Sequence, residues 1–292
     1  MELAVRDIGP LSGEIRVPGD KSISHRALII GSMAKGLTEI YGLAPGADCM
    51  STARCLAALG VDIEEDASSP GHVKIHGKGP QGFREPEDVL DAGNSGTTMR
   101  LLAGLLAAQS FYSVVTGDAS LRRRPIDRIA VPLRMMGASV YGRGDSKYPP
   151  IAIVGGELKP ILYNLPIPSA QVKSCLLLAG AATCGLTTVV EPAKSRDHTE
   201  RMLGFFGADL VESGLAVSIL GKVKLEGRKL YIPGDISSAS FLIAAAVMVP
   251  GSEITIKDVG LNPTRTGFLD LLMRMGADLS LFNRREVCGE LV

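Results

Sequence analysis

Residues 18–34 read PGDKSISHRALIIGSMA, a turn followed by a polar helix start and a run of small apolar residues. This pattern predicts a buried helix over residues 24–35 with Ser22 or Ser24 as its N-cap. Lys21 and Arg26 would then lie beside free backbone N–H groups at the positive end of the helix dipole. The arrangement indicates a binding site for a phosphate or a carboxylate. A capped helix with solvated charges is the alternative at this point.

The same kind of helix recurs along the chain. Hydroxyl-led segments rich in alanine and leucine begin at residues 24, 95, 169 and 237, at intervals of 71, 74 and 68 residues. Because these segments are apolar nearly all round, we expect their helices in the interior. Equivalent buried helices tend to direct their N-termini to the same side. Their polar starts are therefore expected to converge on one polyanionic ligand.

A second marker has nearly the same period. Amphipathic helices that end in glycine, each followed by a strand, have their glycines at Gly60, Gly137, Gly207 and Gly276, at intervals of 77, 70 and 69 residues. Glycine suits a helix C-cap, where a positive φ is needed. Further strands are predicted at residues 114–116, 187–190 and 253–256. The chain is therefore about four copies of an α/β unit of roughly 70 residues. Ordinary α/β composition with coincidental glycines is the alternative.

The predicted helix starts carry hydroxyls, amides and cations. The second start reads GNSGTTMR over residues 93–100, where Asn94 and Ser95 are polar and Gly96 lets a ligand approach the backbone. The third start reads PSAQVKS over residues 168–174. We expect its lysine, Lys173, to accompany a docked anion or to be solvated, because a cation there opposes the helix dipole.

Two basic clusters complete the pattern. Residues 118–128 hold four arginines within seven positions, and arginine binds phosphate and carboxylate in a bidentate manner. Ion pairing of these arginines with Asp118 and Asp127 on the surface is the alternative. Residues 194–201 read KSRDHTER and again combine hydroxyls with cations. His198 is a candidate base, although a lone histidine in a first helical turn is more often a capping or surface residue.

Composition excludes several function classes. The 292 residues contain 31 basic and 31 acidic side chains, so the excess of positive charge typical of nucleic-acid or membrane-surface binding is absent. There is no tryptophan, and the aromatic fraction is 4%, which argues against base-stacking platforms. The five cysteines lack metal-site spacing, and Cys175 and Cys184 are predicted to be small core residues. We expect a cytoplasmic protein without a signal peptide, a membrane span or an ATP-binding loop.

Six segments together resemble the 5-enolpyruvylshikimate-3-phosphate synthase (3-phosphoshikimate 1-carboxyvinyltransferase) family. They are PGDKSISHR, GNSGTTMR, RRRPI, PSAQVKS, KSRDHTERM and GDISSASF, in family order over the whole chain. The resemblance implies an inside-out α/β fold of βαβαββ units, three in each of two domains with the substrates between them. It implies transfer of the enolpyruvyl group of phosphoenolpyruvate to the 5-hydroxyl of shikimate 3-phosphate, with release of phosphate, in aromatic amino acid biosynthesis. No cofactor or metal is expected, and the inhibitor glyphosate is expected to bind.

The resemblance also assigns roles to residues. Lys21 would contact phosphoenolpyruvate and is the candidate for sharing the proton transfer, if burial among cations lowers its pKa. The phosphate of phosphoenolpyruvate would be held by Asn94, Gly96 and Arg124. Shikimate 3-phosphate would be held by Ser22, Arg26, Ser169, Gln171, Ser195 and Arg196, with Gln171 near both substrates. Ala170 stands where many members have a second serine.

About four of the family's six units are expected here, with on the order of 140 further residues in the complete fold. We predict one complete domain over residues 21–233 and an incomplete second domain formed by residues 1–20 and 234–292, with hinges near Gly19 and Gly234. The small-molecule substrates are the only expected partners, and the full-length family is expected to be monomeric. Self-association of this chain stays open. Binding of shikimate 3-phosphate without catalysis is the alternative function. A related transferase that acts on a UDP-sugar is disfavoured, because residues 120–124 lack its loop cysteine.

Overall fold

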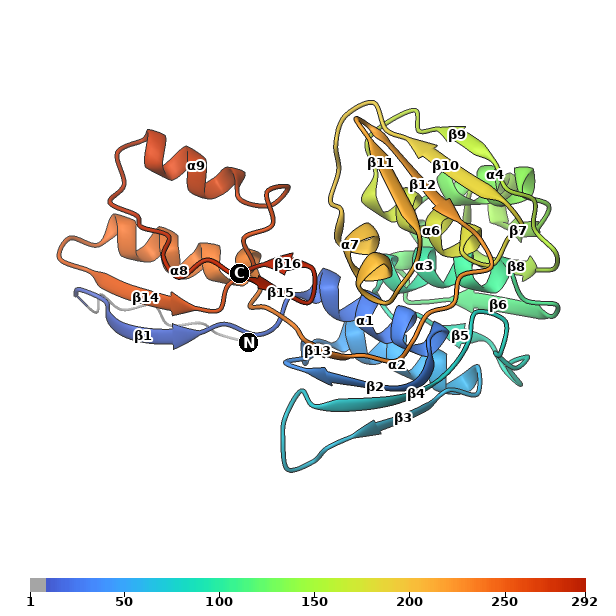
Figure 1. Ribbon diagram of the computed structural model, residues 1–292, viewed down its shortest axis with the longest axis horizontal. Helices are drawn as coiled ribbons and strands as arrows, with labels where there is room; N and C mark the ends of the chain where they lie inside the picture. Colours follow the sequence, from blue (N-terminus) through green and yellow to red (C-terminus); the bar gives the residue numbers. More distant parts are fainter. Residues whose placement is uncertain (1–8) are drawn as a thin grey trace.

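The computed structural model describes residues 9–292, and its first three units repeat one βαβαββ order (Figure 1). The first unit contains β1 (Ser12–Arg16), α1 (Lys21–Met33), β2 (Lys35–Tyr41), α2 (Ala47–Ala58), β3 (Asp62–Glu65) and β4 (Val73–Lys78). The second contains β5 (Leu90–Asp91), α3 (Gly96–Ala107), β6 (Tyr112–Thr116), α4 (Asp127–Met135), β7 (Ser139–Gly142) and β8 (Tyr148–Val154). A 3₁₀ turn (Leu121–Arg123) and the short α5 (Arg143–Ser146) are inserted in this second unit.

The third unit contains β9 (Leu162–Asn164), α6 (Ala170–Gly180), β10 (Leu186–Val190), α7 (His198–Phe205), β11 (Leu210–Ser213) and β12 (Ala216–Leu220). A fourth begins in the same way with β13 (Lys229–Tyr231), α8 (Ile236–Met248), β14 (Glu253–Lys257) and α9 (Gly267–Arg274). A small hairpin, β15 (Glu286–Val287) and β16 (Glu290–Leu291), follows and pairs with itself. The strand expected directly after Gly276 does not form: residues 277–281 have no strand pairing in the described chain.

Three sheets have the same topology. Each has four strands, in the orders β13-β2-β4-β3, β5-β6-β8-β7 and β9-β10-β12-β11, with one parallel pair followed by two antiparallel pairs. The sheets surround α1, α3 and α6, which are buried along most of their length, so the helices are inside and the sheets outside (Figure 1). This is the inside-out α/β fold expected from the sequence. No helix among the described residues is long and apolar enough to cross a membrane.

The chain exchanges strands between its two parts. β1 pairs in parallel with β14 of the fourth unit, and β13 pairs in parallel with β2 of the first. The two crossings lie side by side, because Asp20 N–H donates to Pro233 O (2.8 Å) and Asp235 N–H donates to Pro18 O (2.8 Å). A Cβ at Gly19 would lie 1.9 Å from the Gly42 carbonyl oxygen, so only glycine fits this crossing.

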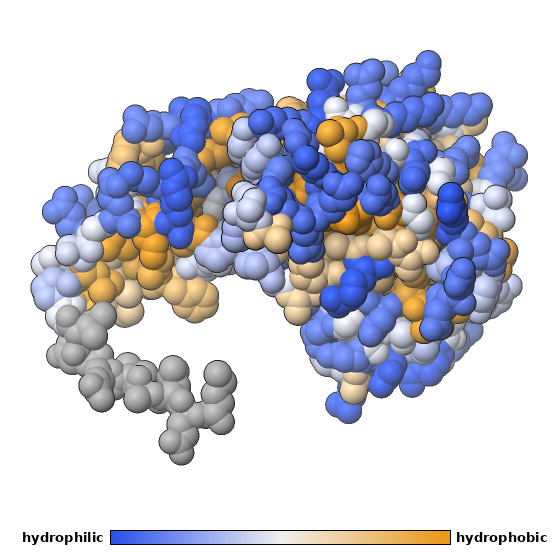
Figure 2. Space-filling view, turned by 90° about the horizontal axis from the view of Figure 1, so that it is seen from below, coloured by the Kyte–Doolittle hydropathy of each residue, from blue (hydrophilic) through white to orange (hydrophobic). Residues whose placement is uncertain are grey.

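The hydrophobic core is divided unequally. One large cluster draws its buried residues from positions 23–232, whereas a second consists of Ile236, Ala239 and Leu269 with partly buried neighbours. We propose the division into residues 21–233 and residues 1–20 plus 234–292 on this basis. The space-filling view is indented between the two parts, and apolar surface shows on the smaller one (Figure 2).

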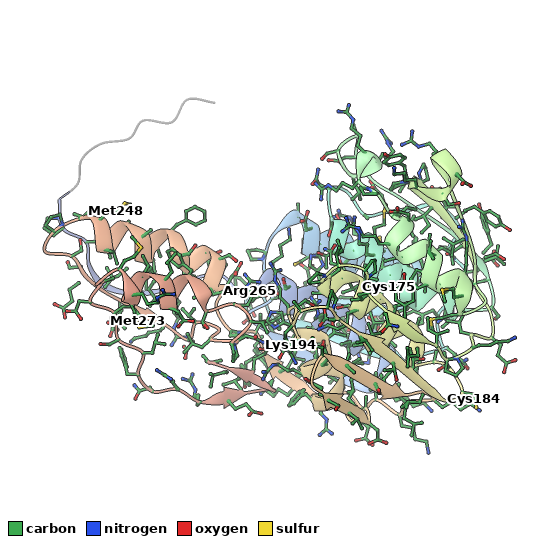
Figure 3. All side chains as sticks on the ribbon, turned by 90° about the horizontal axis from the view of Figure 1, so that it is seen from above. Cys175, Cys184, Lys194, Met248, Arg265 and Met273 are labelled. Atoms are coloured by element: carbon green, nitrogen blue, oxygen red, sulfur yellow. The ribbon has the colours of Figure 1, made fainter. Side chains whose placement is uncertain are left out.

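The expectation that all four apolar helices are interior is wrong for α8. Only Ile236 and Ala239 are buried in that helix, while Phe241 is 79% exposed and Met248 is 74% exposed. The reason is a lack of neighbours: α3 and α6 pack against each other, whereas α8 lies on β14 with α9 nearby (Figure 1). Cys184 is also exposed, because α6 ends at Gly180 and leaves this cysteine in the following turn (Figure 3). Cys175 is buried as expected.

Candidate functional site

The three buried helices begin with side-chain caps. Ser95 Oγ accepts from Thr98 N–H (3.0 Å), and Ser169 Oγ accepts from Val172 N–H (3.4 Å). At α1 the cap is Asp20, whose carboxylate accepts from Ile23 N–H (2.9 Å), so the prediction of Ser22 or Ser24 is wrong. A carboxylate at this position also interacts with the helix dipole, and it leaves the Ser22 hydroxyl available to other groups.

Polar contacts join the starts of α1, α3 and α6. Gln171 Nε2 of α6 donates to Thr97 Oγ1 of α3 (3.0 Å). Arg26 of α1 donates from Nη2 to Ser174 Oγ of α6 (2.8 Å) and from Nε to Thr199 Oγ1 of α7 (2.6 Å). The expected convergence of the helix starts is therefore confirmed for these three helices. Several N-terminal N–H groups and cations are gathered on one side, as an anionic ligand requires.

Arg26 itself is enclosed. Its side chain is buried, and a third hydrogen bond joins Nη1 to the Ser22 carbonyl (2.8 Å). Burial lowers the pKa of the guanidinium to about 10, so it stays charged at neutral pH. Three of its five N–H donors are engaged by protein groups.

Asn94, Gly96 and Arg124 form the rim at the start of α3. Arg124 Nη2 donates to Asn94 Oδ1 (2.5 Å), and Asn94 Nδ2 donates to Asp118 Oδ2 (2.6 Å). Gly96 lies beneath the guanidinium groups: a Cβ there would be 2.6 Å from Arg100 Nη1 and 3.4 Å from Arg124 Nη1. Asn94 bridges Arg124 to Asp118, and hydrogen bonds lower the pKa of Asp118, with a smaller contribution from the charge of Arg124.

Arg100 was not predicted as a site residue. It links two predicted site residues, Gly96 and Gln171, and contacts Pro125, which follows Arg124. Its Nη1 donates to Gln171 Oε1 (3.1 Å) and to the Gly96 carbonyl (3.2 Å), and its Nη2 donates to the Pro125 carbonyl (2.9 Å). Burial lowers its pKa, and the nearby positive charge of Arg124 adds to this. The signal in the sequence was weak, because an arginine one turn into an apolar helix resembles an ordinary snorkelling side chain.

Lys21, Ser22 and Arg196 lie where the two parts meet. The Lys21 ammonium pairs with the Asp48 carboxylate and is 53% exposed, so it is not buried among cations as the proton-transfer argument supposed. Arg196 Nη1 donates to Ser22 Oγ (3.4 Å). Burial lowers the pKa of Arg196, and the charge of Arg265 contributes to this shift. Arg265 donates to Ser237 at the start of α8 and lies at the junction (Figure 3).

Ser195 adjoins the buried cluster that contains Lys173. Ser195 Oγ donates to Glu191, whose other oxygen lies 2.6 Å from Lys173 Nζ. Lys173 is 1% exposed and also pairs with Glu200 (2.6 Å). The expectation of a solvated side chain is therefore wrong, and the anions beside Lys173 are two carboxylates of the protein instead of a docked ligand. The Lys173 side chain points inward between two carboxylates that the local sequence did not connect with it.

His198 is neither a surface nor a capping residue. It is 1% exposed, and its Nδ1 lies 2.7 Å from Glu290 Oε1 in β16. Asn262 completes this junction cluster: its Nδ2 donates to Asp197 Oδ1 (2.7 Å) and Glu290 Oε2 (3.0 Å). These contacts join α7 of the larger part to the hairpin of the smaller one. The pairing of His198 with Glu290 could not be predicted from local sequence, because the two residues are 92 positions apart.

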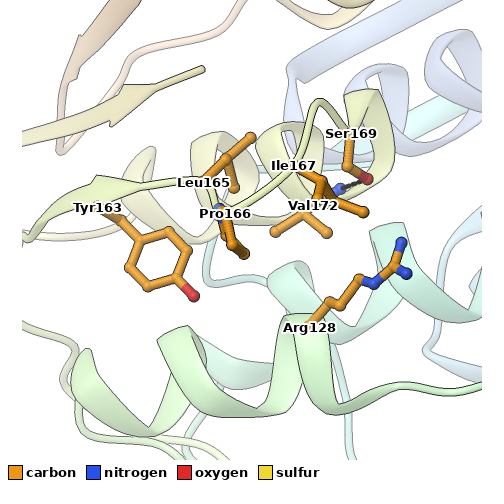
Figure 4. A pocket seen from close by; sticks show the side chains of 7 residues that line it. All are labelled: Arg128, Tyr163, Leu165, Pro166, Ile167, Ser169 and Val172. Atoms are coloured by element: carbon orange, nitrogen blue, oxygen red, sulfur yellow. Dashed lines mark hydrogen bonds between the residues drawn. The ribbon is translucent and has the colours of Figure 1, made fainter. Parts of the chain in front are cut away.

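Ser169 also borders a small pocket between α4 and α6. The pocket is lined by Arg128, Tyr163, Leu165, Pro166, Ile167, Ser169 and Val172. Arg128 extends from α4 towards the start of α6 (Figure 4). Elsewhere in residues 9–292, the one group of metal-ligating side chains close enough to share an ion is Asp62, Glu64 and His76. All three are exposed on the sheet of β3 and β4 and take no part in the helix-start cluster.

Comparisons with known proteins agree on one family. The family described as EPSP synthase (3-phosphoshikimate 1-carboxyvinyltransferase) matches residues 5–287. Relatives named 3-phosphoshikimate 1-carboxyvinyltransferase include one from Geobacillus thermodenitrificans, 54% identical over 94% of this chain and 63% of the relative. Another, from Desulforamulus reducens, is 51% identical over 99% of this chain and 67% of the relative.

A solved structure of EPSP synthase from Acinetobacter baumannii is 48% identical, with a TM-score of 0.91 over 97% of this chain and 63% of that one. The chain thus spans about two thirds of the length of the relatives it matches. The repeated units, the converging helix starts and these matches lead to one conclusion: the chain belongs to the EPSP synthase family.

Proposed function

We propose that this protein transfers the enolpyruvyl group of phosphoenolpyruvate to the 5-hydroxyl of shikimate 3-phosphate and releases phosphate. The observation that carries the proposal is the joining of the α1, α3 and α6 starts by Arg26 and Gln171, in a chain of the EPSP synthase family. Relatives that share about half of its sequence carry the name of this activity. Two phosphorylated substrates need two clusters of donors, and the proposed site residues fall into two such clusters.

Phosphoenolpyruvate is proposed to bind on the Arg124 side. Asn94, Gly96 and Arg124 lie together there, and Gly96 leaves room for the Arg100 and Arg124 guanidinium groups above the start of α3. The α3 N-terminus and the guanidinium supply directed N–H donors to a phosphate group. Lys21 is proposed to contact the same substrate, and it would have to leave Asp48 to do so. A ligand anion can replace that carboxylate at little cost, since Lys21 is half exposed and ion pairs open to solvent contribute little stability.

Shikimate 3-phosphate is proposed to bind on the Ser22 side. Ser22, Arg26 and Arg196 are joined by hydrogen bonds. Ser169, Gln171 and Ser195 stand at the adjoining α6 start and at the turn before α7. Gln171 lies between the clusters, because Arg100 and Thr97 of α3 hold both ends of its amide.

The proposed reaction is an addition followed by an elimination. Protonation at C3 of phosphoenolpyruvate and attack on C2 by the 5-hydroxyl, which gives up its proton, form a tetrahedral intermediate. Phosphate then leaves from C2 while the C3 methyl group loses a proton, which restores the enolpyruvyl double bond. The cations of both clusters would stabilise the charge that develops on the phosphate. A positioned acid and base are also required, and Lys21 is the proposed contributor from this chain. We further propose that the protein acts in the cytoplasm, and that its full-length form is a monomer.

The test combines turnover and binding. Phosphate release by the chain would be measured with both substrates, and binding of shikimate 3-phosphate alone would be measured by calorimetry. We expect Lys21→Ala to abolish turnover and Lys78→Ala, an exposed lysine on β4, to leave it unchanged. Binding without turnover would favour the alternative of a binding protein that does not catalyse. Absence of both binding and turnover would overturn the proposed function.

A further inference from the structure

The Lys173 side chain is almost fully buried, and it borders a small pocket that Glu191 and Glu200 also line. It is among the largest fully buried side chains of the protein, and its Nζ lies 2.6 Å from Glu191 Oε2 and 2.6 Å from Glu200 Oε1. Glu191 directly follows β10, and Glu200 lies in the first turn of α7. The lysine in α6 therefore joins the two ends of the connection between β10 and α7.

The charges of this cluster alternate in space. Lys173 separates two carboxylates that are 3% and 4% exposed, and the field of Glu200 also acts on the buried Arg26. Burial raises the pKa of Glu200, whereas the nearby Lys173 charge opposes that shift. Lys173 thus has a carboxylate on each side, which matters because an unpaired buried charge is strongly destabilising.

The second carboxylate oxygen of Glu191 accepts a hydrogen bond from Ser195. Ser195 Oγ donates to Glu191 Oε1, and Ser195 N–H points to Glu191 Oε2 (3.3 Å). A carboxylate accepts at both oxygens, so Glu191 can serve Lys173 and Ser195 at once. Thus the backbone of the connection is fixed at Ser195 by a side chain that Lys173 itself holds.

The next residues reach the start of α1. Arg196 Nη1 donates to Ser22 Oγ (3.4 Å), and Thr199 Oγ1 accepts from Arg26 Nε (2.6 Å). We propose that Lys173 and Glu191 are positioning residues, which hold residues 191–197 so that Ser195 and Arg196 face Ser22. The inference rests on the proposed function only for the identity of the ligand, shikimate 3-phosphate. The geometry of the connection can be measured without it.

The decisive variant is Glu191→Gln. An amide has nearly the same shape, but it accepts at one end and donates at the other. Its oxygen can still accept from Lys173, and its NH2 can donate to the Ser195 hydroxyl, but the negative charge that pairs with Lys173 is lost and the Ser195 hydrogen bond must reverse its direction. The matched control is Lys194→Met. Lys194 lies in the same connection, and this change removes its exposed ion pair with Glu212 of β11 (side chains 41% and 44% exposed). Lys173→Arg serves as a second variant, because it keeps the charge but changes the contact geometry.

The measurements are amide hydrogen exchange over residues 191–197 and calorimetric binding of shikimate 3-phosphate. We expect Glu191→Gln to speed exchange in this connection by about tenfold and to weaken binding by a similar factor, as loss of one charged hydrogen bond does. Lys173→Arg should act in the same direction, and Lys194→Met should change neither quantity more than about twofold.

Each outcome bears on the proposal. Unchanged exchange in both cluster variants would overturn it, and so would a uniform rise over the whole chain, since the cluster would then be a general stabiliser. Faster exchange confined to residues 191–197 supports it. The two proposals can also be told apart. If the variants show the expected faster exchange but the unsubstituted chain does not bind shikimate 3-phosphate, the proposed function fails while the positioning role stands.

Discussion

The helices α3 and α8 come from the same repeat, but their surroundings differ. Both are apolar helices that follow a polar cap, Ser95 in one and Asp235 in the other. Six residues after the cap, Leu101 of α3 is fully buried, whereas Phe241 of α8 is 79% exposed. The difference lies in the neighbours: α3 packs against α1, α4 and α6, and α8 has β14 and α9. Apolar composition thus shows that a helix can be buried, and the packing of other elements decides whether it is.

The largest expected effect concerns a buried histidine of the larger part. His25 is fully buried, its Nδ1 contacts Thr52 Oγ1 (2.7 Å), and burial lowers its pKa to about 3 from the ordinary 6.5. In the unfolded chain His25 is therefore protonated below about pH 6.5, whereas in the folded chain it is protonated only below about pH 3. Stability is lost as the pH falls through this window, by up to about 5 kcal/mol.

Denaturant unfolding at several pH values would check this prediction. His25→Gln should flatten the dependence between pH 6.5 and 3, and His76→Gln, at an exposed position on β4, should not. Because residues 234–292 contain no histidine, the acid-sensitive transition should belong to the larger part. Equal pH profiles for His25→Gln and the unsubstituted protein would contradict the prediction.

The second prediction compares the equivalent positions directly. Leu101→Ala should lower the free energy of unfolding by about 2–5 kcal/mol, because it leaves a cavity among packed helices. Phe241→Ala should change it by no more than about 0.5 kcal/mol, as for other exposed sites. Chemical denaturation of both variants measures the contrast. A large loss for Phe241→Ala would show that α8 is covered in solution.

The third prediction concerns the junction between the two parts. Asn262→Ala removes the donor that Asp197 and Glu290 share, which should cost about 1–3 kcal/mol because two buried carboxylates lose a partner. We expect hydrogen exchange to rise in the β15–β16 hairpin before it rises in α3 and α6. Asn164→Ala, at an exposed position in β9, is the control. Simultaneous loss of protection in both parts would mean that they unfold as one unit.

The smallest expected change in the free energy of unfolding concerns the contact between α3 and α6. The helix α8 has no equivalent contact among the described residues. Gly96→Ala places a methyl group 2.6 Å from Arg100 Nη1, so the guanidinium must move away from Gln171 and the Gly96 carbonyl. The cost should be about 1 kcal/mol and should shrink when Arg100 is also changed to alanine, since contacting residues are coupled. Gly156→Ala, where the added carbon meets nothing, is the control. Additive effects in the double variant would rule out coupling through Arg100.

Much of the repeating architecture was predictable from the sequence. The four marker glycines follow α2, α4, α7 and α9 with φ between 83° and 107°, as the expected C-caps require. Ser95 and Ser169 are caps, and the strands expected at residues 114–116, 187–190 and 253–256 lie in β6, β10 and β14. These features are local, because a cap, a positive φ or an apolar face depends on residues within one or two turns.

The candidate site was predictable in residue type more than in contacts. Asn94 and Arg124 meet as the motifs suggested, and the other expected site residues keep their roles as proposals. The partners of Lys173 and His198 and the link through Arg100 were not predicted, whereas the pairing of the N-terminal strand β1 with β14 was expected from the family resemblance. In each case the decisive neighbour lies far along the chain, as Glu290 does for His198.

The sequence by itself determined the unit, its period and the polar character of the helix starts, since these follow from short-range sterics and hydrogen bonding. Only the tertiary structure decided which apolar helix is enclosed and which charged groups are buried. Burial and electrostatic pairing depend on surfaces brought together from distant residues. From local sequence, Lys173 could be interpreted as a solvated cation, but in the folded protein it is a buried ion between two carboxylates.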